Sequence, residues 1–199
     1  MKRFFILGLL LCSVVLYADD CSEALNEAKN LYNAGNYSLA KSLFEYIISE
    51  CGANYGDATA WSKKCRYAVI NDITVDHNVY ESGQKGMRIH VKFDAYNVLN
   101  HSIKVCVYFY YSGGNKALNG IRESGYCTPD GHVTVQSSST ATYTNSTWSD
   151  FTLFMPYQKL NMQSGCKDLS LEGQVGILDK TTEKWLTSEY KKFYFTFSN

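Results

Sequence analysis

The chain has 199 residues, and its 19 Lys and Arg residues are balanced by 19 Asp and Glu residues. This neutrality excludes a strongly basic surface of the kind that binds nucleic acid. The length allows one larger domain or two small ones, and the 16 Tyr, 10 Phe and 3 Trp residues are typical of β-sheets and of recognition surfaces alike.

The chain begins with the pattern of a secretory signal peptide. Lys2 and Arg3 precede an apolar run from Phe4 to Val15, and the small residue Ala18 stands before two aspartates; this order is typical of an export leader. The apolar run is shorter than the roughly 18 to 20 residues that a membrane span needs. We therefore expect cleavage after Ala18 and export to the periplasm or cell surface, with a retained anchor as the alternative. No later segment has the apolar length of a membrane span.

Cleavage would remove Cys12 from the seven cysteines of the chain and leave six. An even number of cysteines in an exported protein predicts disulfide bonds, and the sequence lacks the Cys-x-x-Cys spacing that is common in zinc sites. Six cysteines allow 15 pairings, so the connectivity stays open. The candidates are Cys21, Cys51, Cys65, Cys106, Cys127 and Cys166.

Two helices are predicted directly after the leader. Asp20 and Glu23 are spaced as an N-cap and its capping-box partner, apolar residues follow at helical intervals, and Gly35 ends the pattern. Ser38 is placed to cap a second helix, whose apolar stripe extends from Leu39 to Ile48. Because the turn between the two helices is short, they should lie antiparallel to each other.

The antiparallel arrangement bears on the cysteines. The start of the first helix lies beside the end of the second, which brings Cys21 close to Cys51. A bond between Cys51 and Cys65, across the loop from Gly52 to Lys64, is the alternative. Within that stretch Asp57 is placed to cap a third helix, whose inner face would include Cys65.

Six positions of the predicted hairpin carry small or aromatic residues, namely Ala28, Tyr32, Gly35, Tyr37, Ala40 and Phe44. In this spacing the hairpin resembles one tetratricopeptide repeat followed by the first helix of the next, over about 45 residues. The resemblance implies closely packed helices with a groove for a partner protein. The alternative is a plain helical hairpin that packs against a sheet or is stapled by disulfides.

From residue 68 onward the helical period gives way to alternation. Apolar and polar residues alternate from Met87 to Tyr96 and from Ile103 to Tyr111, as in half-buried strands, and the short polar break between them predicts a β-hairpin. With the other candidates, about seven to nine short strands predict an antiparallel β-sandwich. The other candidates begin at Val69, near Tyr126, and at His132, Phe151, Leu169, Lys184 and Phe193.

Three segments of this region carry a resemblance to a known fold, namely His77 to Tyr80, Gly83 to His90 and Phe151 to Leu160. They resemble an immunoglobulin-like or C2-like sandwich of the kind found after helical repeats in exported proteins of Gram-negative bacteria. The resemblance implies a structural framework and transfers no catalytic residue.

The sequence as a whole predicts an α+β protein in two parts. A signal peptide covers residues 1–18, and a tetratricopeptide-like helical segment, a hairpin plus a third helix, covers 19–67. An antiparallel, immunoglobulin-like β-sandwich covers 68–199.

The sequence holds no motif that predicts catalysis. A nucleophile elbow of the G-x-S-x-G type is absent, as is a glycine loop that could cradle a phosphate between a strand and a helix. One aspartate in each candidate loop is too few for calcium. We therefore expect neither enzyme activity nor a bound metal or cofactor.

Aromatic residues on the polar strand faces are the best sign of function. Half-exposed tyrosines on a sheet often contact proteins or sugars, although tyrosine is also an ordinary strand residue. The binding candidates are Tyr96, Tyr108, Tyr110, His90, Trp148 and Tyr157. His90 shares its face with Arg88 and Lys92, which favours a solvated residue over a metal ligand.

We expect a binding protein that contacts a partner protein through its helical groove or its sheet face. Carbohydrate binding by exposed aromatic residues is the alternative. An enzyme or enzyme subunit with an unrecognised site is the third possibility.

Overall fold

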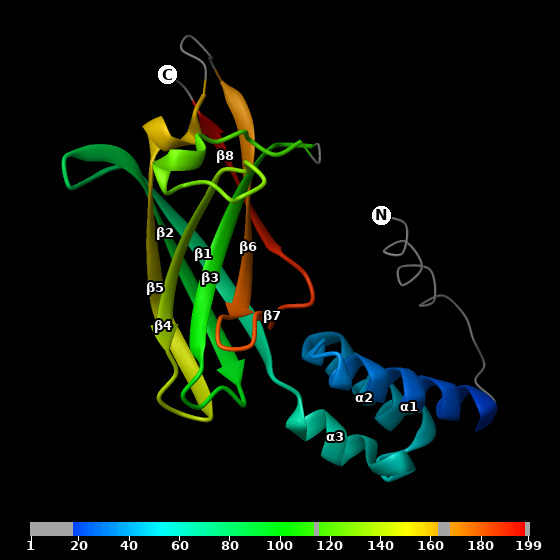
Figure 1. Ribbon diagram of the computed structural model, residues 1–199. Coiled ribbons are helices and arrows are strands. Elements are labelled where there is room, and N and C mark those ends of the chain that lie inside the picture. The colour runs from blue at the N-terminus through cyan, green and yellow to red at the C-terminus, as the bar shows by residue number, and fades with distance from the viewer. Residues whose placement is uncertain (1–17, 114–115, 163–167, 198–199) are drawn as a thin grey trace.

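The computed structural model describes residues 18–113, 116–162 and 168–197, which form three α-helices followed by eight strands in two antiparallel sheets packed together (Figure 1). The two-part α+β fold predicted from the sequence is therefore confirmed. The predicted leader up to residue 17 and Cys166 lie outside the described residues. The strands are β1 Tyr67–Glu81, β2 Gln84–Tyr96, β3 Ser102–Tyr111, β4 Thr134–Thr140, β5 Asn145–Pro156, β6 Leu169–Asp179, β7 Lys184–Trp185 and β8 Lys191–Phe197.

The helical segment consists of α1 Ala18–Asn33, α2 Tyr37–Cys51 and α3 Ala58–Lys64. Its own small core is built from the side chains expected to pack there, and Ala28, Ala40 and Phe44 are fully buried. None of the described helices is both long and apolar enough to cross a membrane.

The disulfide links Cys21 to Cys51, whose Cα atoms are 6.2 Å apart, so the pairing predicted from the antiparallel helices is confirmed. The alternative with Cys65 is excluded because Cys65 is a buried free thiol, and the disulfide candidates Cys106 and Cys127 are free thiols as well. Burial raises the pKa of the Cys65 thiol to about 11.

The predicted helix caps differ from those observed. Asn36, not Ser38, takes the N-cap position of α2, because the chain leaves α1 through Gly35 at φ +78° and re-enters a helix at once. Its carbonyl accepts the first helical hydrogen bond from the Ala40 amide at 2.9 Å. Asp57 does precede α3, but its side chain makes no capping bond because its backbone is left-handed.

The three-stranded sheet has the order β1-β2-β5, and the five-stranded sheet has the order β4-β3-β6-β7 with β8 also paired to β6. β1 and β5, at 15 and 12 residues, are longer than the short strands predicted. The segment near Tyr126 contributes only an isolated bridge between Cys127 and Val133.

The prediction that β2 and β3 form a hairpin is wrong. β2 pairs with β1 and β5, whereas β3 pairs with β4 and β6, so residues 97–101 carry the chain from one sheet to the other. Phe93 and Val105 are both fully buried, as alternation predicted. The apolar face of a strand is buried just as well when the next strand lies in the opposite sheet, across the core. Alternation therefore shows which face is buried and does not show which strands pair.

One edge of the sandwich is closed by a side chain. β1 is an edge strand of its sheet, and Lys191 at the start of β8 extends to it. Its Nζ donates hydrogen bonds to the backbone carbonyls of Ile70 and Asn71, at 3.2 and 2.6 Å. β1 also departs from regular pairing at Asn78, where φ is +60°.

The helical segment meets the sandwich near β7 (Figure 1). Asp179, at the end of β6, is fully buried, and its Oδ2 accepts hydrogen bonds from Arg66 Nη1 at 3.1 Å and Thr182 Oγ1 at 2.7 Å. Nδ1 of His101 lies 2.8 Å from the same oxygen. Arg66 also donates from Nη2 to the Tyr37 hydroxyl at 3.1 Å. One polar network thus connects α2, the junction between α3 and β1, and the end of β6.

Candidate functional site

The three tyrosines expected on one surface lie on two. Tyr96 is on β2 in the three-stranded sheet, where it stacks on Tyr67 with 4.5 Å between ring centroids. Tyr108 and Tyr110 are on β3 and face outward from the five-stranded sheet. Because the outer faces of packed sheets point away from each other, Tyr96 cannot share a ligand with the other two. This difference follows from the crossover between β2 and β3.

His90 lies between two carboxylates rather than between two cations. Its Nε2 is 3.2 Å from Asp76 Oδ2 and its Nδ1 is 2.7 Å from Asp150 Oδ1, so the ring bridges β1, β2 and β5. The neighbouring Arg88 pairs instead with Glu81. The described residues include no group of His, Cys, Asp and Glu that is suited to hold a metal ion.

Trp148 and Tyr157 pack against the core. Trp148 stacks on Phe93 with 4.6 Å between ring centroids. The Tyr157 hydroxyl lies 3.2 Å from His77 Nδ1, and it accepts a hydrogen bond from the Asn78 amide at 3.1 Å. Tyr157 also lines a cleft of ≈ 770 Å³ at the end of the sandwich where β1, β2 and β8 meet.

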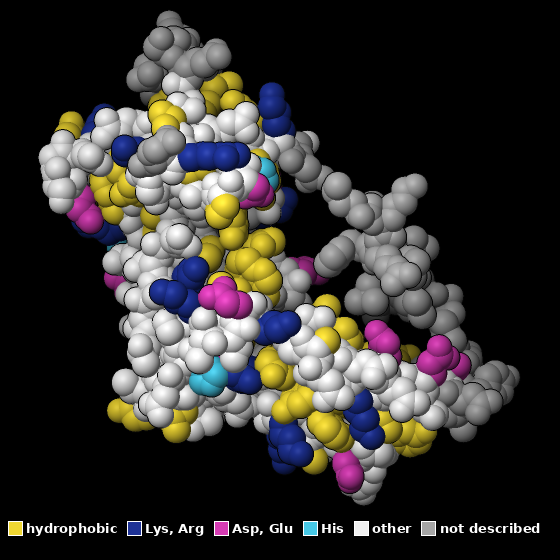
Figure 2. All heavy atoms as spheres, in the orientation of Figure 1, with side chains coloured by type: hydrophobic (Ala, Val, Ile, Leu, Met, Phe, Trp, Pro, Cys, Tyr) yellow, Lys and Arg dark blue, Asp and Glu magenta, His cyan; other side chains and the backbone are white. Residues whose placement is uncertain are grey.

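Five aromatic side chains gather on the outer face of the five-stranded sheet, around three polar residues of β6 and β8. Figure 2 shows hydrophobic side chains over β6 with charged groups beside them. We call this set the aromatic face; it consists of Tyr108, Tyr110, Trp185, Tyr190, Tyr194, Glu172, Gln174 and Lys192.

One end of the aromatic face is a cluster of three rings. Tyr190 packs edge-on against Tyr108 and Trp185, with centroid distances of 5.9 and 5.5 Å. Gly176 leaves the space for these rings, because a Cβ there would lie 2.5 Å from Tyr190 Cε1 and 2.9 Å from Trp185 Cζ3. Burial raises the pKa of Tyr108 and of Tyr190, so both hydroxyls stay protonated and can donate as well as accept hydrogen bonds.

The other end is built around a buried carboxylate. Glu172 pairs in register with Tyr110 on one side and Tyr194 on the other, and its side chain is only 4% exposed. Its Oε1 accepts hydrogen bonds from Gln174 Nε2 at 2.7 Å and Lys192 Nζ at 3.1 Å. Burial acts to raise the pKa of Glu172, but these two bonds and the lysine charge together lower it. The carboxylate is therefore ionised, paired and held in place.

The sequence identified part of this surface. Tyr108 and Tyr110 were predicted on a polar strand face. Tyr194 was not among the candidates, and it faces outward because it alternates with the buried Phe193 and Phe195 of β8. Glu172 and Gln174 alternate with buried residues in the same way along β6. Trp185 has no comparable signal, because only the pairing of β7 with β6 brings it to this face.

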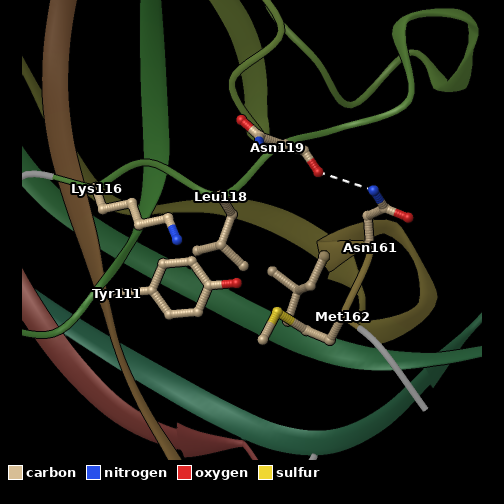
Figure 3. A pocket seen from close by; sticks show the side chains of 7 residues that line it. Tyr111, Lys116, Leu118, Asn119, Asn161 and Met162 are labelled. Atoms are coloured by element: carbon tan, nitrogen blue, oxygen red, sulfur yellow. Dashed lines mark hydrogen bonds between the residues drawn. The ribbon is translucent and has the colours of Figure 1, made fainter.

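A smaller hollow of ≈ 560 Å³ lies at the end of β3 (Figure 3). Lys116 Nζ is 5.3 Å from the ring centre of Tyr111, and Asn161 Nδ2 donates to the Asn119 carbonyl at 2.9 Å. Leu118 is among the apolar residues that line the hollow. The Asn161 amide and the Lys116 ammonium group thus already have partners within the rim of the hollow.

No protein-family model and no curated protein matches the sequence. Among solved structures, the chain is similar to parts of three bacterial proteins. A complex of Bacteroides uniformis β-glucuronidase 2 with covalently bound cyclophellitol-6-carboxylate aziridine shares 11% identity at a TM-score of 0.41, over 66% of this chain and 14% of that one. A Bacteroides uniformis β-glucuronidase shares 11% at 0.36, over 66% and 13%. OgpA from Akkermansia muciniphila shares 10% at 0.29, over 71% and 34%. The chain thus spans no more than 34% of the length of these three proteins.

Proposed function

We propose that this chain is a non-enzymatic carbohydrate-binding protein that acts through the aromatic face. The observation that carries the proposal is the combination of exposed rings with a fixed polar row on one sheet surface. A sugar ring has an apolar side of C–H groups and a rim of hydroxyls. Aromatic rings cover the apolar side, while placed polar groups bind the rim.

The state of Glu172 favours binding over catalysis. A general acid or base works best when its pKa lies near the working pH. The pKa of Glu172 is instead lowered from the ordinary glutamate value, and its Oε1 is engaged by Gln174 and Lys192. A buried, paired carboxylate of this kind is poorly suited to transfer protons.

The proposal includes export and the finer resemblances of the two parts. The Cys21–Cys51 disulfide suits an oxidising compartment outside the cytoplasm. The burial of Ala28, Ala40 and Phe44 supports a tetratricopeptide-like hairpin, and the two packed antiparallel sheets support an immunoglobulin-like sandwich. Intact mass of the secreted protein should give Asp19 as the first residue; a mature chain that retains Met1 would contradict export with cleavage.

A protein partner is the second candidate, and the helical segment favours it. The ring of Trp61 on α3 is half-buried. Nζ of Lys29 and Nζ of Lys64 lie 5.7 and 4.9 Å from its centre. An aromatic ring with two ammonium groups near it suits an acidic peptide.

The two candidates are separated by two binding assays on the same variants. Wild-type protein and the variants Tyr194→Ala, Trp61→Ala and Tyr143→Ala are applied to a glycan array and used for pull-down from an envelope extract. Tyr143 is the matched control, since its exposure of 71% resembles the 64% of Tyr194 and it lies outside the aromatic face.

We expect glycan capture by the wild type, by Tyr143→Ala and by Trp61→Ala, and weaker capture of glycans longer than a disaccharide by Tyr194→Ala. Thermal melts should show that all variants are folded. Capture of an envelope protein that is lost in Trp61→Ala, with no glycan bound by the wild type, would reject carbohydrate binding in favour of a protein partner.

A further inference from the structure

We infer that the aromatic face binds the interior of an uncharged glycan chain and contacts about three consecutive sugar units along the strands. This inference rests on the proposed function and adds the length and the charge of the ligand. It follows from the spacing of the rings, from the openness of the face and from the balance of its charges.

The spacing sets the length of the ligand. The rings of Trp185 and Tyr190 lie over Gly176, whereas Tyr194 pairs in register with Glu172. Gly176 and Glu172 are four positions apart on β6, which at about 3.3 Å per residue is roughly 13 Å. A single sugar can contact only one of these two groups of rings, and about three linked pyranose rings are needed to touch both.

A row of residues across β3, β6 and β8 lies between the two groups of rings. Tyr108 pairs with Gln174, and Gln174 pairs with Lys192, midway between Gly176 and Glu172. Polar atoms therefore stand between two aromatic contacts. A glycan chain offers the same alternation, with hydroxyls and linkages between the apolar sides of its rings.

The face is open rather than enclosed. Trp185, Tyr190 and Tyr194 are 36%, 42% and 64% exposed. They project from the outside of a sheet, and the hollows of ≈ 560 and ≈ 770 Å³ have other linings. An open face accepts a chain that continues at both ends, whereas recognition of a chain terminus needs a pocket that closes around it.

The charges of the face cancel. Glu172 is neutralised by Lys192 across a 3.1 Å contact. Since the carboxylate of the aromatic face is paired with its lysine, the face favours a neutral glycan over a sulfated or uronic-acid polymer.

The test uses neutral oligosaccharides of increasing length as probes. Isothermal titration is carried out with oligomers of β-1,4-linked glucose, xylose and N-acetylglucosamine and of α-1,4-linked glucose, from single sugars to hexasaccharides. In a series that binds, we expect Kd to fall by about tenfold or more from disaccharide to tetrasaccharide, which is about 1.4 kcal/mol, and then to level off. Raising salt from about 0.05 to about 0.5 M should leave Kd nearly unchanged.

Tyr194→Ala removes the far contact and should abolish the gain beyond the disaccharide while keeping disaccharide affinity. Tyr143→Ala should retain the full length dependence. Equal affinity for single sugars and hexasaccharides, capture of anionic glycans alone, or failure of all four neutral series would overturn this inference and leave carbohydrate binding intact. Absence of any glycan ligand on the array would overturn the proposed function itself.

Discussion

Nη1 of Arg66, at the end of the helical segment, lies 3.1 Å from Oδ2 of Asp179, at the end of β6. The Asp179 side chain is fully buried and the Arg66 side chain is 20% exposed. The second carboxylate oxygen accepts a hydrogen bond from the Thr181 amide at 3.0 Å. The carboxylate is thus paired with a residue from outside the sandwich, and this contact joins the helical segment to β6.

Arg66→Ala should destabilise the protein by about 3 to 5 kcal/mol, because it leaves a buried carboxylate without its cation. Arg88→Ala is the matched control, since the Arg88–Glu81 pair is exposed and should be worth about 1 kcal/mol or less. Urea unfolding of both variants provides the comparison. Similar losses in the two variants would show that Arg66 contributes no more than a surface charge.

Phe93→Ala should cost about 3 to 5 kcal/mol by opening a cavity in the fully buried core. Tyr194→Ala should cost about 0.5 kcal/mol or less, since the ring is mostly exposed and contributes little to packing. Thermal and chemical denaturation measure both. If Tyr194→Ala unfolds as readily as Phe93→Ala, the aromatic face is a packed surface and not a binding site.

Removal of the disulfide by Cys51→Ser should weaken the helical segment. A closed loop of about 30 residues contributes roughly 3 to 4 kcal/mol in the chain-entropy model. Limited proteolysis should cut the variant within residues 19–64 before the sandwich is attacked. Non-reducing peptide mapping of the wild type checks the bond itself, and a free thiol at Cys21 would contradict it.

The pair of Glu172 and Lys192 should make stability depend on pH. The pKa of Glu172 is lowered in the folded protein, so its contribution is complete above the ordinary glutamate pKa of about 4.3 and is lost as the pH falls through the lower folded-state value.

The stability difference between the wild type and Glu172→Gln should accordingly shrink between about pH 6 and pH 3. Urea unfolding across that range measures it, with Glu81→Gln as an exposed control. A difference that stays constant with pH would show that the carboxylate is not preferentially ionised in the native state.

Local patterns predicted the elements better than their partners. The alternation around Phe93 and Val105 correctly identified the buried side of both strands, and the short turn at Gly35 correctly brought Cys21 to Cys51. The same alternation could not distinguish a hairpin from two strands that face each other across a core. Tyr96 was assigned to the wrong surface for that reason.

The candidate site was predictable to the extent that it is local. Tyr108 and Tyr110 follow from the period of a single strand. The fixed carboxylate of Glu172 depends on neighbours in β3 and β8, and Trp185 reaches the face through a two-residue strand. Contacts between segments far apart in sequence carry no periodic signal, and the sequence alone therefore did not reveal them.

Lys191 affects whether the free edge of β1 can pair with a strand of a second molecule. The free edge of a long strand such as β1 is a template on which a strand from a second molecule can add. By donating to the carbonyls of Ile70 and Asn71, the ammonium group covers the place where the regular pairing of β1 with β2 is interrupted. It also places a positive charge on that edge, which disfavours edge-to-edge aggregation at high concentration.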